Sequence, residues 1–434
     1  MKLWRIVTLL AVTILAASAP LGSAPAVEIT WSSTQLNPVN EQEWARNTML
    51  RPFEEESSMR VRFVSDLAGP FIDRLVAEAR AGRGSVDIIG TLHGDYPLLV
   101  AEGAVQDVAA VLRQLDGRPD RTFVPDLVRA GQIGGMQSFV PWMQATYLIA
   151  AHKQAMRYFP AGRDPMRMTY DDLLQWGENI RSVTGQRRIG FPASPTGLYG
   201  RFLHGYAYPS FTGSQVKKFK SPEAVSMWRY LRRLWGVSHP SSFTYGFMNE
   251  PLLRGEVWVA WDHVARLLPA FRERPDDFVA LPSPAGPRGR SFLSVIVGLG
   301  IPKNSPNPEA AARLIEYLTR PRTQVLTLQG VGFFPVVREA AGVVPTGGLK
   351  VMAEGVTAQA TATDARTALL PIGLGARTGE FVPLYLETFT LIAIQGRNIE
   401  QVLNDQARKL EEMYRTTNAP CPPPDSAERP CRPD

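Results

Sequence analysis

The chain has 434 residues, of which 44% are hydrophobic and 20% are charged, and its formal net charge is +6. This composition excludes a disordered protein, and the length is too great for one ordinary core, so two lobes or domains are expected. The basic residues are scattered, and we interpret the densest stretches, 216–220 and 229–235, as solvated faces. We therefore expect no nucleic-acid partner.

Residues 1–26 have the pattern of a signal peptide. Lys2 and Arg5 precede an apolar stretch, 6–17, that is too short to span a bilayer, and Ala24-Pro25-Ala26 supplies the small residues of a cleavage site. No cysteine stands directly after the apolar stretch, so we expect no lipid anchor on an N-terminal cysteine. The mature protein is predicted to begin at Val27 and to be soluble and periplasmic.

The remaining chain alternates short apolar strands with amphipathic helices, the pattern of an α/β fold. Strands are expected at 27–31, 59–65, 86–90 and 256–261, and helices near 44–53, 70–82, 96–103, 169–184, 222–236, 307–318 and 398–414. Two longer apolar runs also occur. Polar residues and a proline interrupt 138–153, which suits a strand that crosses between two lobes, and 291–303 is suited to the return crossing.

Polar residues follow each of the first three predicted strands, at 32–35, 66–69 and 91–95. Ligands of open α/β sheets lie beyond the carboxyl ends of the strands. The sequence therefore predicts a ligand site where these three loops meet.

Motifs of catalysis are scarce. The five histidines do not have the spacing of a zinc helix, and no nucleophile elbow, phosphate-binding loop or dinucleotide fingerprint occurs. Ser214 and Lys217 match an S-x-x-K motif whose companion K-T-G is missing. We expect a protein that is not an enzyme and has no cofactor or metal, with an exported hydrolase as the alternative, because catalytic carboxylates can come from distant loops.

Five segments, in the same order, are similar to motifs of one family. They are LVAEARAGRGSVDIIGTLHGDYPLLVAEGAVQDV (75–108), FVPWMQATYLIAAHKQAM (139–156), TYDDLLQWGENI (169–180), LLRGEVWVAWDH (252–263) and the stretch from VGLGIPK to GFFPV (297–336). Together they resemble the extracellular solute-binding proteins of ABC importers, in the sugar-binding group that includes maltose-binding proteins.

The resemblance implies a two-lobed periplasmic-binding-protein fold of the α/β class, whose crossing hinge segments leave a ligand cleft between the lobes. The implied N-terminal lobe is 27–141 with 297–325, and the implied C-terminal lobe is 142–296 with 326–418. The family's proteins close on a ligand by hinge motion and present it to a membrane permease, without chemistry on the ligand. A monomer is implied.

The family positions also imply which residues hold a sugar. Aromatic rings would cover its apolar face and polar side chains would pair with its hydroxyls. The implied residues are Ser33, Gln35, His93, Asp95, Trp142, Gln144, Tyr199, Trp261, Asp262, His263 and Phe333.

Alternatives stay open at several of these positions. Asp95 and Asp262 also suit helix caps, and Trp31 suits a core. Ala265 stands where the family often has a stacking tryptophan, so maltose itself is not implied. A phosphorylated polyol is the alternative ligand, with Arg201 and Arg377 as phosphate partners.

Residues 419–434 form a proline-rich tail that contains both cysteines of the chain, Cys421 and Cys431. Two thiols this close in an exported protein are expected to oxidise to a disulfide. Metal binding is disfavoured, because nothing nearby supplies further ligands.

Overall fold

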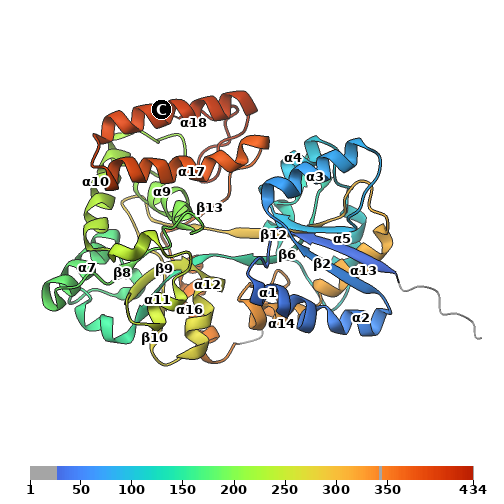
Figure 1. The fold of residues 1–434 in the computed structure, drawn as a ribbon, viewed down its shortest axis with the longest axis horizontal. Helices are drawn as coiled ribbons and strands as arrows, with labels where there is room; N and C mark the ends of the chain where they lie inside the picture. Colours follow the sequence, from blue (N-terminus) through green and yellow to red (C-terminus); the bar gives the residue numbers. More distant parts are fainter. Residues whose placement is uncertain (1–26, 342–344, 434) are drawn as a thin grey trace, which may run out of the picture.

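The protein has two α/β lobes, each built around its own sheet (Figure 1). The computed structural model describes residues 27–341 and 345–433, so the expected signal peptide and its cleavage site lie outside the described residues. The first sheet has the order β2 (Arg60–Ser65), β1 (Glu28–Ser33), β3 (Ile88–Leu92), β12 (Val295–Gly300) and β6 (Val140–Ala145). The second has the order β10 (Phe278–Leu281), β7 (Tyr147–His152), β9 (Val259–His263) and β8 (Ile189–Gly190).

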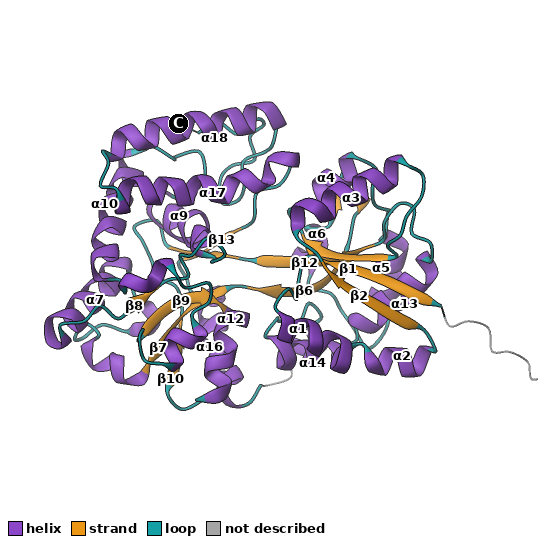
Figure 2. Cartoon of the chain, viewed as in Figure 1, coloured by secondary structure: helices purple, strands orange, loops and turns teal. Residues whose placement is uncertain are grey.

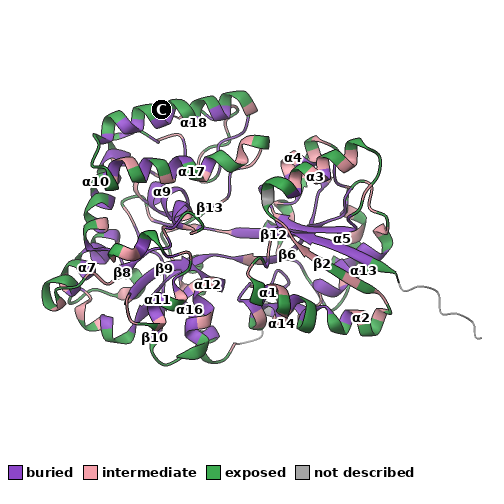
Figure 3. Cartoon of the chain, viewed as in Figure 1, coloured by how far each residue is buried: buried purple, intermediate pink, exposed green. Residues whose placement is uncertain are grey.

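The first lobe follows the predicted alternation of strands and helices. β1 pairs in parallel with both β2 and β3, and helices cover the two faces of the sheet (Figure 2). Ile29, Trp31 and Ile88 are fully buried, as expected for parallel strands packed on both faces (Figure 3). The helices are α1 (Val39–Trp44), α2 (Arg51–Ser57), α3 (Ala68–Arg80), α4 (Tyr96–Ala101), α5 (Ala109–Asp116), α6 (Pro125–Arg129), α13 (Pro308–Leu318), α14 (Pro321–Val331) and α15 (Arg338–Ala341).

The second lobe contains most of the helices of the C-terminal half. Thr169 and Asp172 form the predicted capping box of α7 (Tyr170–Thr184), in which each side chain pairs with the other residue's backbone N–H. The other helices are α8 (Tyr199–Phe202), α9 (Tyr208–Thr212), α10 (Pro222–Val237), α11 (Asn249–Leu253), α12 (Val264–Glu273), α16 (Gly347–Thr361), α17 (Thr378–Phe389) and α18 (Ile399–Thr417). Within residues 27–341 and 345–433, no helix has the length and apolarity needed to cross a membrane.

Two extended segments join the lobes, as the two long apolar runs predicted. β6 and β7 belong to different sheets and are separated only by Thr146. On the return path, Ser294 alone separates β12 from β11 (Arg290–Leu293), which pairs in the second lobe with β13 (Ala365–Ala368). β6 and β12 run antiparallel beside each other between the lobes (Figure 1).

The chain returns to the second lobe later than the resemblance implied. Backbone hydrogen bonds join Val124 to Val336 and Arg338 to Thr122, so the segment after α14 stays with the first lobe. α16 is the next helix, and it packs against β10 and α12 of the second lobe. We therefore propose a lobe boundary after residue 341 rather than at 325/326.

The C-terminal tail is folded against the second lobe. Cys421 and Cys431 form the expected disulfide. Within the loop that they close, the Asp425 carboxylate accepts hydrogen bonds from the backbone N–H groups of Gln215 and Val216, at 3.0 and 2.8 Å. These hydrogen bonds attach the tail to the second lobe.

The disulfide prediction is tested by replacing both cysteines, Cys421→Ser with Cys431→Ser. Because the bond closes a loop with a sequence separation of only 10, its loss should lower the free energy of unfolding by no more than about 3 kcal/mol. Chemical denaturation measures the change, and thiol labelling of the denatured, unreduced wild type should find no reactive thiol. Two labelled thiols per chain would exclude the bond.

Candidate functional site

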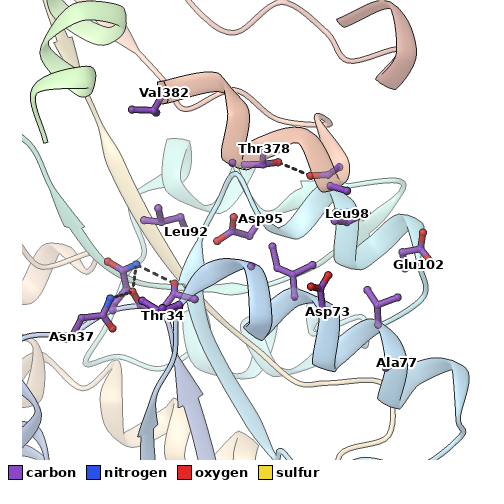
Figure 4. A pocket seen from close by; sticks show the side chains of 18 of the residues that line it. Thr34, Asn37, Asp73, Ala77, Leu92, Asp95, Leu98, Glu102, Thr378 and Val382 are labelled. Carbon is purple, nitrogen blue, oxygen red and sulfur yellow. Dashed lines mark hydrogen bonds between the residues drawn. The ribbon is translucent and has the colours of Figure 1, made fainter. Parts of the chain in front are cut away.

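A cavity of about 880 Å³ lies between the two lobes. Its first-lobe wall comes from the loop after β1, from α3 and from the segment between β3 and α4 (Figure 4). Its second-lobe wall comes from Arg201 of α8 and from residues at the start of α17, including Thr378 and Val382. The predicted site residues Gln35 and Asp95 line this cavity, and so does Arg201.

Hydrogen bonds tie the ends of β1 and β3 together beside the cavity. The Ser33 hydroxyl donates to the carbonyl oxygen of Gly90 at 2.9 Å, and the Thr34 and Thr91 hydroxyls are 2.8 Å apart. Thr91 in turn donates to the Asp95 carboxylate. The polar ends of two strands therefore form one connected network, as expected for parallel neighbours.

Two glycines of this segment have close neighbours at the position that a Cβ atom would occupy. A side chain at Gly90 would have its Cβ 3.0 Å from Ser33 Oγ, and one at Gly94 would have its Cβ 3.1 Å from the carbonyl oxygen of Pro371. Because Pro371 belongs to the second lobe, Gly94 marks a point where the lobes meet closely.

Asp95 is buried at the wall of the cavity. It occupies the N-cap position of α4 but makes no capping hydrogen bond through its side chain, which binds Thr91 instead. Burial raises the pKa of its carboxyl, while the hydrogen bond from Thr91 and the charge of Arg201 oppose that shift. The helix-cap interpretation therefore does not explain this carboxylate.

His93 lies next to the cavity wall and is buried. Its backbone N–H donates to the carbonyl oxygen of Ile296, and its Nε2 atom has no hydrogen-bond partner among the described residues. Burial lowers its pKa to about 4, so the imidazole is neutral near pH 7.

The two tryptophans expected to stack on a sugar are in the lobe cores in this conformation. Trp142 is fully buried and packs edge-on against Trp31. Trp261 is also fully buried, and its ring lies parallel to Tyr147 with centroids 4.6 Å apart. Both rings use their apolar surface against protein groups, which leaves no free face for a ligand here.

The remaining predicted residues also lie outside the cavity. Tyr199 packs in the second-lobe core against Phe202, and Phe333 is buried near His263. Gln144 donates to the carbonyl oxygen of Pro335 at 2.8 Å, which fastens that segment to β6. These contacts give each of the residues a structural role in this arrangement of the lobes.

His263, rather than Asp262, caps the helix that follows β9. His263 Nδ1 accepts the capping hydrogen bond from the backbone N–H of Ala265 at the start of α12. Asp262 lies inside β9, where its carboxylate accepts from the backbone N–H groups of Met248 and His263, at 2.9 and 2.7 Å. Asp262 is therefore not the cap of α12, because these two backbone N–H donors already satisfy its carboxylate oxygens.

Sequence reasoning missed most of the second-lobe wall. Gly375, Thr378, Gly379 and Val382 line the cavity from the start of α17, in a segment for which we predicted no element. The closely spaced glycines at 373, 375 and 379 were the available signal, since they indicate a turn before a helix. Within the described residues, no group of histidine, cysteine, aspartate and glutamate side chains is placed to hold a metal ion.

Asp262→Ala should reduce stability rather than ligand binding. The change leaves two buried N–H donors without acceptors, at a cost of about 1–3 kcal/mol each in the free energy of unfolding. Chemical denaturation measures this loss, and calorimetry measures binding in the cavity, which Asp262 does not line. A variant of unchanged stability that has lost binding would contradict the structural role.

Acid should destabilise the fold through its buried histidines. The folded-state pKa of His93 lies at about 4, below its ordinary value of 6.5, so the unfolded chain binds the proton first as the pH falls. This contribution to stability is present above pH 6.5 and is lost between pH 6.5 and about pH 4. When the pH falls from 7 to 5, the free energy of unfolding of His93→Gln should decrease by about 2 kcal/mol less than that of the wild type. Urea denaturation at both pH values measures it, and equal losses would refute the assignment.

Comparisons with known proteins agree with this architecture. Three solved structures share the fold: maltose-bound MalE3 of T. maritima, maltotriose-bound maltotriose binding protein of Thermus thermophilus, and UgpB of Mycobacterium tuberculosis in complex with glycerophosphocholine. Their sequence identities are 20%, 17% and 17%, and their TM-scores are 0.73, 0.66 and 0.69. The alignments cover 89%, 88% and 91% of this chain and 100%, 99% and 100% of those chains.

These likenesses show the two-lobed fold of periplasmic binding proteins. No curated protein sequence matches the chain. Residues 39–325 match the family described as bacterial extracellular solute-binding proteins. Since the match spans more than half of the chain, the protein belongs to the bacterial extracellular solute-binding protein family.

Proposed function

We propose that the protein is the substrate-binding component of an ABC importer, which captures a sugar in the interlobe cavity and delivers it to a membrane permease. The observation that carries this proposal is the meeting of Gln35 and Asp95, from the ends of two first-lobe strands, with the second-lobe residues Arg201 and Thr378 around one cavity. A ligand held by both walls favours the closed form that a permease recognises.

The comparisons support a sugar as the ligand class, because the MalE3 structure holds maltose and the Thermus thermophilus protein holds maltotriose. A phosphorylated polyol is the second candidate, since UgpB holds glycerophosphocholine. In either case we propose that the protein acts as an exported monomer in the periplasm, without its signal peptide, and does no chemistry on its ligand.

A thermal-shift screen tests the proposal. The purified mature protein is heated with individual mono- and oligosaccharides and with polyol phosphates, and a true ligand should raise the melting temperature in a concentration-dependent way. If no compound of either class changes the melting temperature, the solute class is wrong. Turnover of a sugar during incubation, followed by chromatography, would favour the hydrolase alternative.

Gln35→Ala should weaken ligand binding roughly fivefold, the loss expected for one neutral hydrogen bond in the cavity. The matched control is Gln114→Ala, an exposed glutamine of α5 that does not line this cavity. Isothermal titration calorimetry with the hit from the screen measures both variants. An equal effect of the two substitutions would place the ligand elsewhere.

A further inference from the structure

The apolar part of the cavity wall is aliphatic. Leu67, Ile72, Val76, Leu92, Leu98 and Val382 line it, and among the described residues around it there is no phenylalanine, tyrosine or tryptophan. A neutral pyranose would therefore find no ring to stack on in this conformation. Selectivity for a polar ligand has to come from charged and hydrogen-bonding groups.

Arg201 is the one cavity-lining cation without a protein partner among the described residues. It lies on α8, and neither an ion pair nor a hydrogen bond of its guanidinium group is present. Arg80, on the same cavity, binds Glu102 at 2.6 Å, and Arg377, next to the cavity, binds Glu380 at 2.7 Å. The other arginines here are thus neutralised and Arg201 is available.

The groups that face Arg201 do not neutralise it. Burial lowers the pKa of His93 to about 4 and those of His204 and His263 to about 3, and it raises that of Tyr147 to about 12, so all four are neutral at pH 7. The charge of Arg201 acts on the carboxyl of Asp95, and no ion pair joins the two side chains in the part of the chain that the structure describes. Asp95 instead accepts the Thr91 hydroxyl, and burial raises its pKa.

We propose that Arg201 binds an oxyanion of the ligand, a phosphate or a carboxylate, so that the captured solute is an acidic sugar or polyol. This inference rests on the proposed function. A guanidinium group presents parallel N–H donors that match two oxygens of such a group, and the resulting charge-assisted bonds are about twice as strong as neutral ones. The aliphatic wall then packs against the carbon chain of the ligand.

The test uses two matched sets of probes on the full mature protein: glucose, glucuronate and glucose 6-phosphate, and glycerol with glycerol 3-phosphate. Calorimetry should show that an acidic member binds at least about tenfold more tightly than its neutral counterpart. Which acid binds distinguishes the phosphate from the carboxylate. Added salt should weaken the acidic member more than the neutral one.

Variants assign the effect to the residue. Arg201→Gln should remove the preference for the acidic member, and Arg201→Lys should retain part of it, because lysine keeps the charge but lacks the planar fork. Arg408→Gln is the matched control and should keep the full preference, since Arg408 of α18 pairs with Asp405 and does not line the cavity. Melting temperatures show whether each variant folds. If Arg201→Gln does not fold, the reduced preference of Arg201→Lys tests the role of Arg201.

Two results would overturn the proposal. Binding of the neutral member with equal or greater affinity, unchanged in its selectivity by Arg201→Gln, refutes the oxyanion site while leaving a sugar-binding function intact. Absence of binding by every acidic probe also refutes it. The solute-binding function itself fails only if the wider screen of sugars and polyol phosphates finds no ligand either.

Discussion

The pairing of β6 with β12 between the lobes determines where every other part of the molecule can lie. These strands are far apart in the sequence, yet they leave the first sheet side by side, with Val295 opposite Ala145. The Thr146 hydroxyl, at the end of one crossing, donates to the carbonyl oxygen of Leu293 at the end of the other, at 3.0 Å. Each lobe therefore continues directly from the same pair of strands, and changes of backbone angle near Thr146 and Ser294 would rotate the lobes.

The contacts between the lobes differ on the two sides of the β6–β12 pair. On the side of α1 and α12, Glu41 pairs with Arg266, and Arg272 donates to the carbonyl oxygen of Gly330, so protein groups bind across the gap. The cavity lies on the other side, between residues of α3 and α4 in the first lobe and of α17 in the second; Figure 1 shows where these helices lie. The tail contacts the segment that leads into α17. In that segment the backbone N–H of Leu369 donates a hydrogen bond to the carbonyl oxygen of Pro423 in the tail. The tail that the disulfide closes thus contacts the segment that leads into α17, although the two are far apart in the sequence.

Local pattern was enough to predict the parts of the fold that depend on nearby residues. The parallel strands, the two crossings, the capping box of α7 and the disulfide each follow from spacing within a short stretch. The site was predicted only in part, for a physical reason. An aromatic residue of a strand, such as Trp142 or Trp261, gains the same favourable burial from a lobe core as from a cleft, and sequence does not separate the two. The wall around Thr378 required knowledge of how distant segments pack, which no local pattern contains.

Because the walls of the cavity belong to different lobes, the affinity for a ligand and the closure of the lobes are linked. The first-lobe wall is prearranged, since Ser33, Thr34 and Thr91 are already hydrogen-bonded to each other or to backbone, and Asp95 is bound to Thr91. The second-lobe wall contributes Arg201, whose guanidinium group has no ion pair or hydrogen bond within residues 27–341 and 345–433. A ligand that satisfies only the first wall would bind open and closed forms alike and would not shift the population. A ligand bound at the proposed oxyanion site would gain its additional free energy only in the closed form, so the contact that selects the ligand would also favour closure of the lobes.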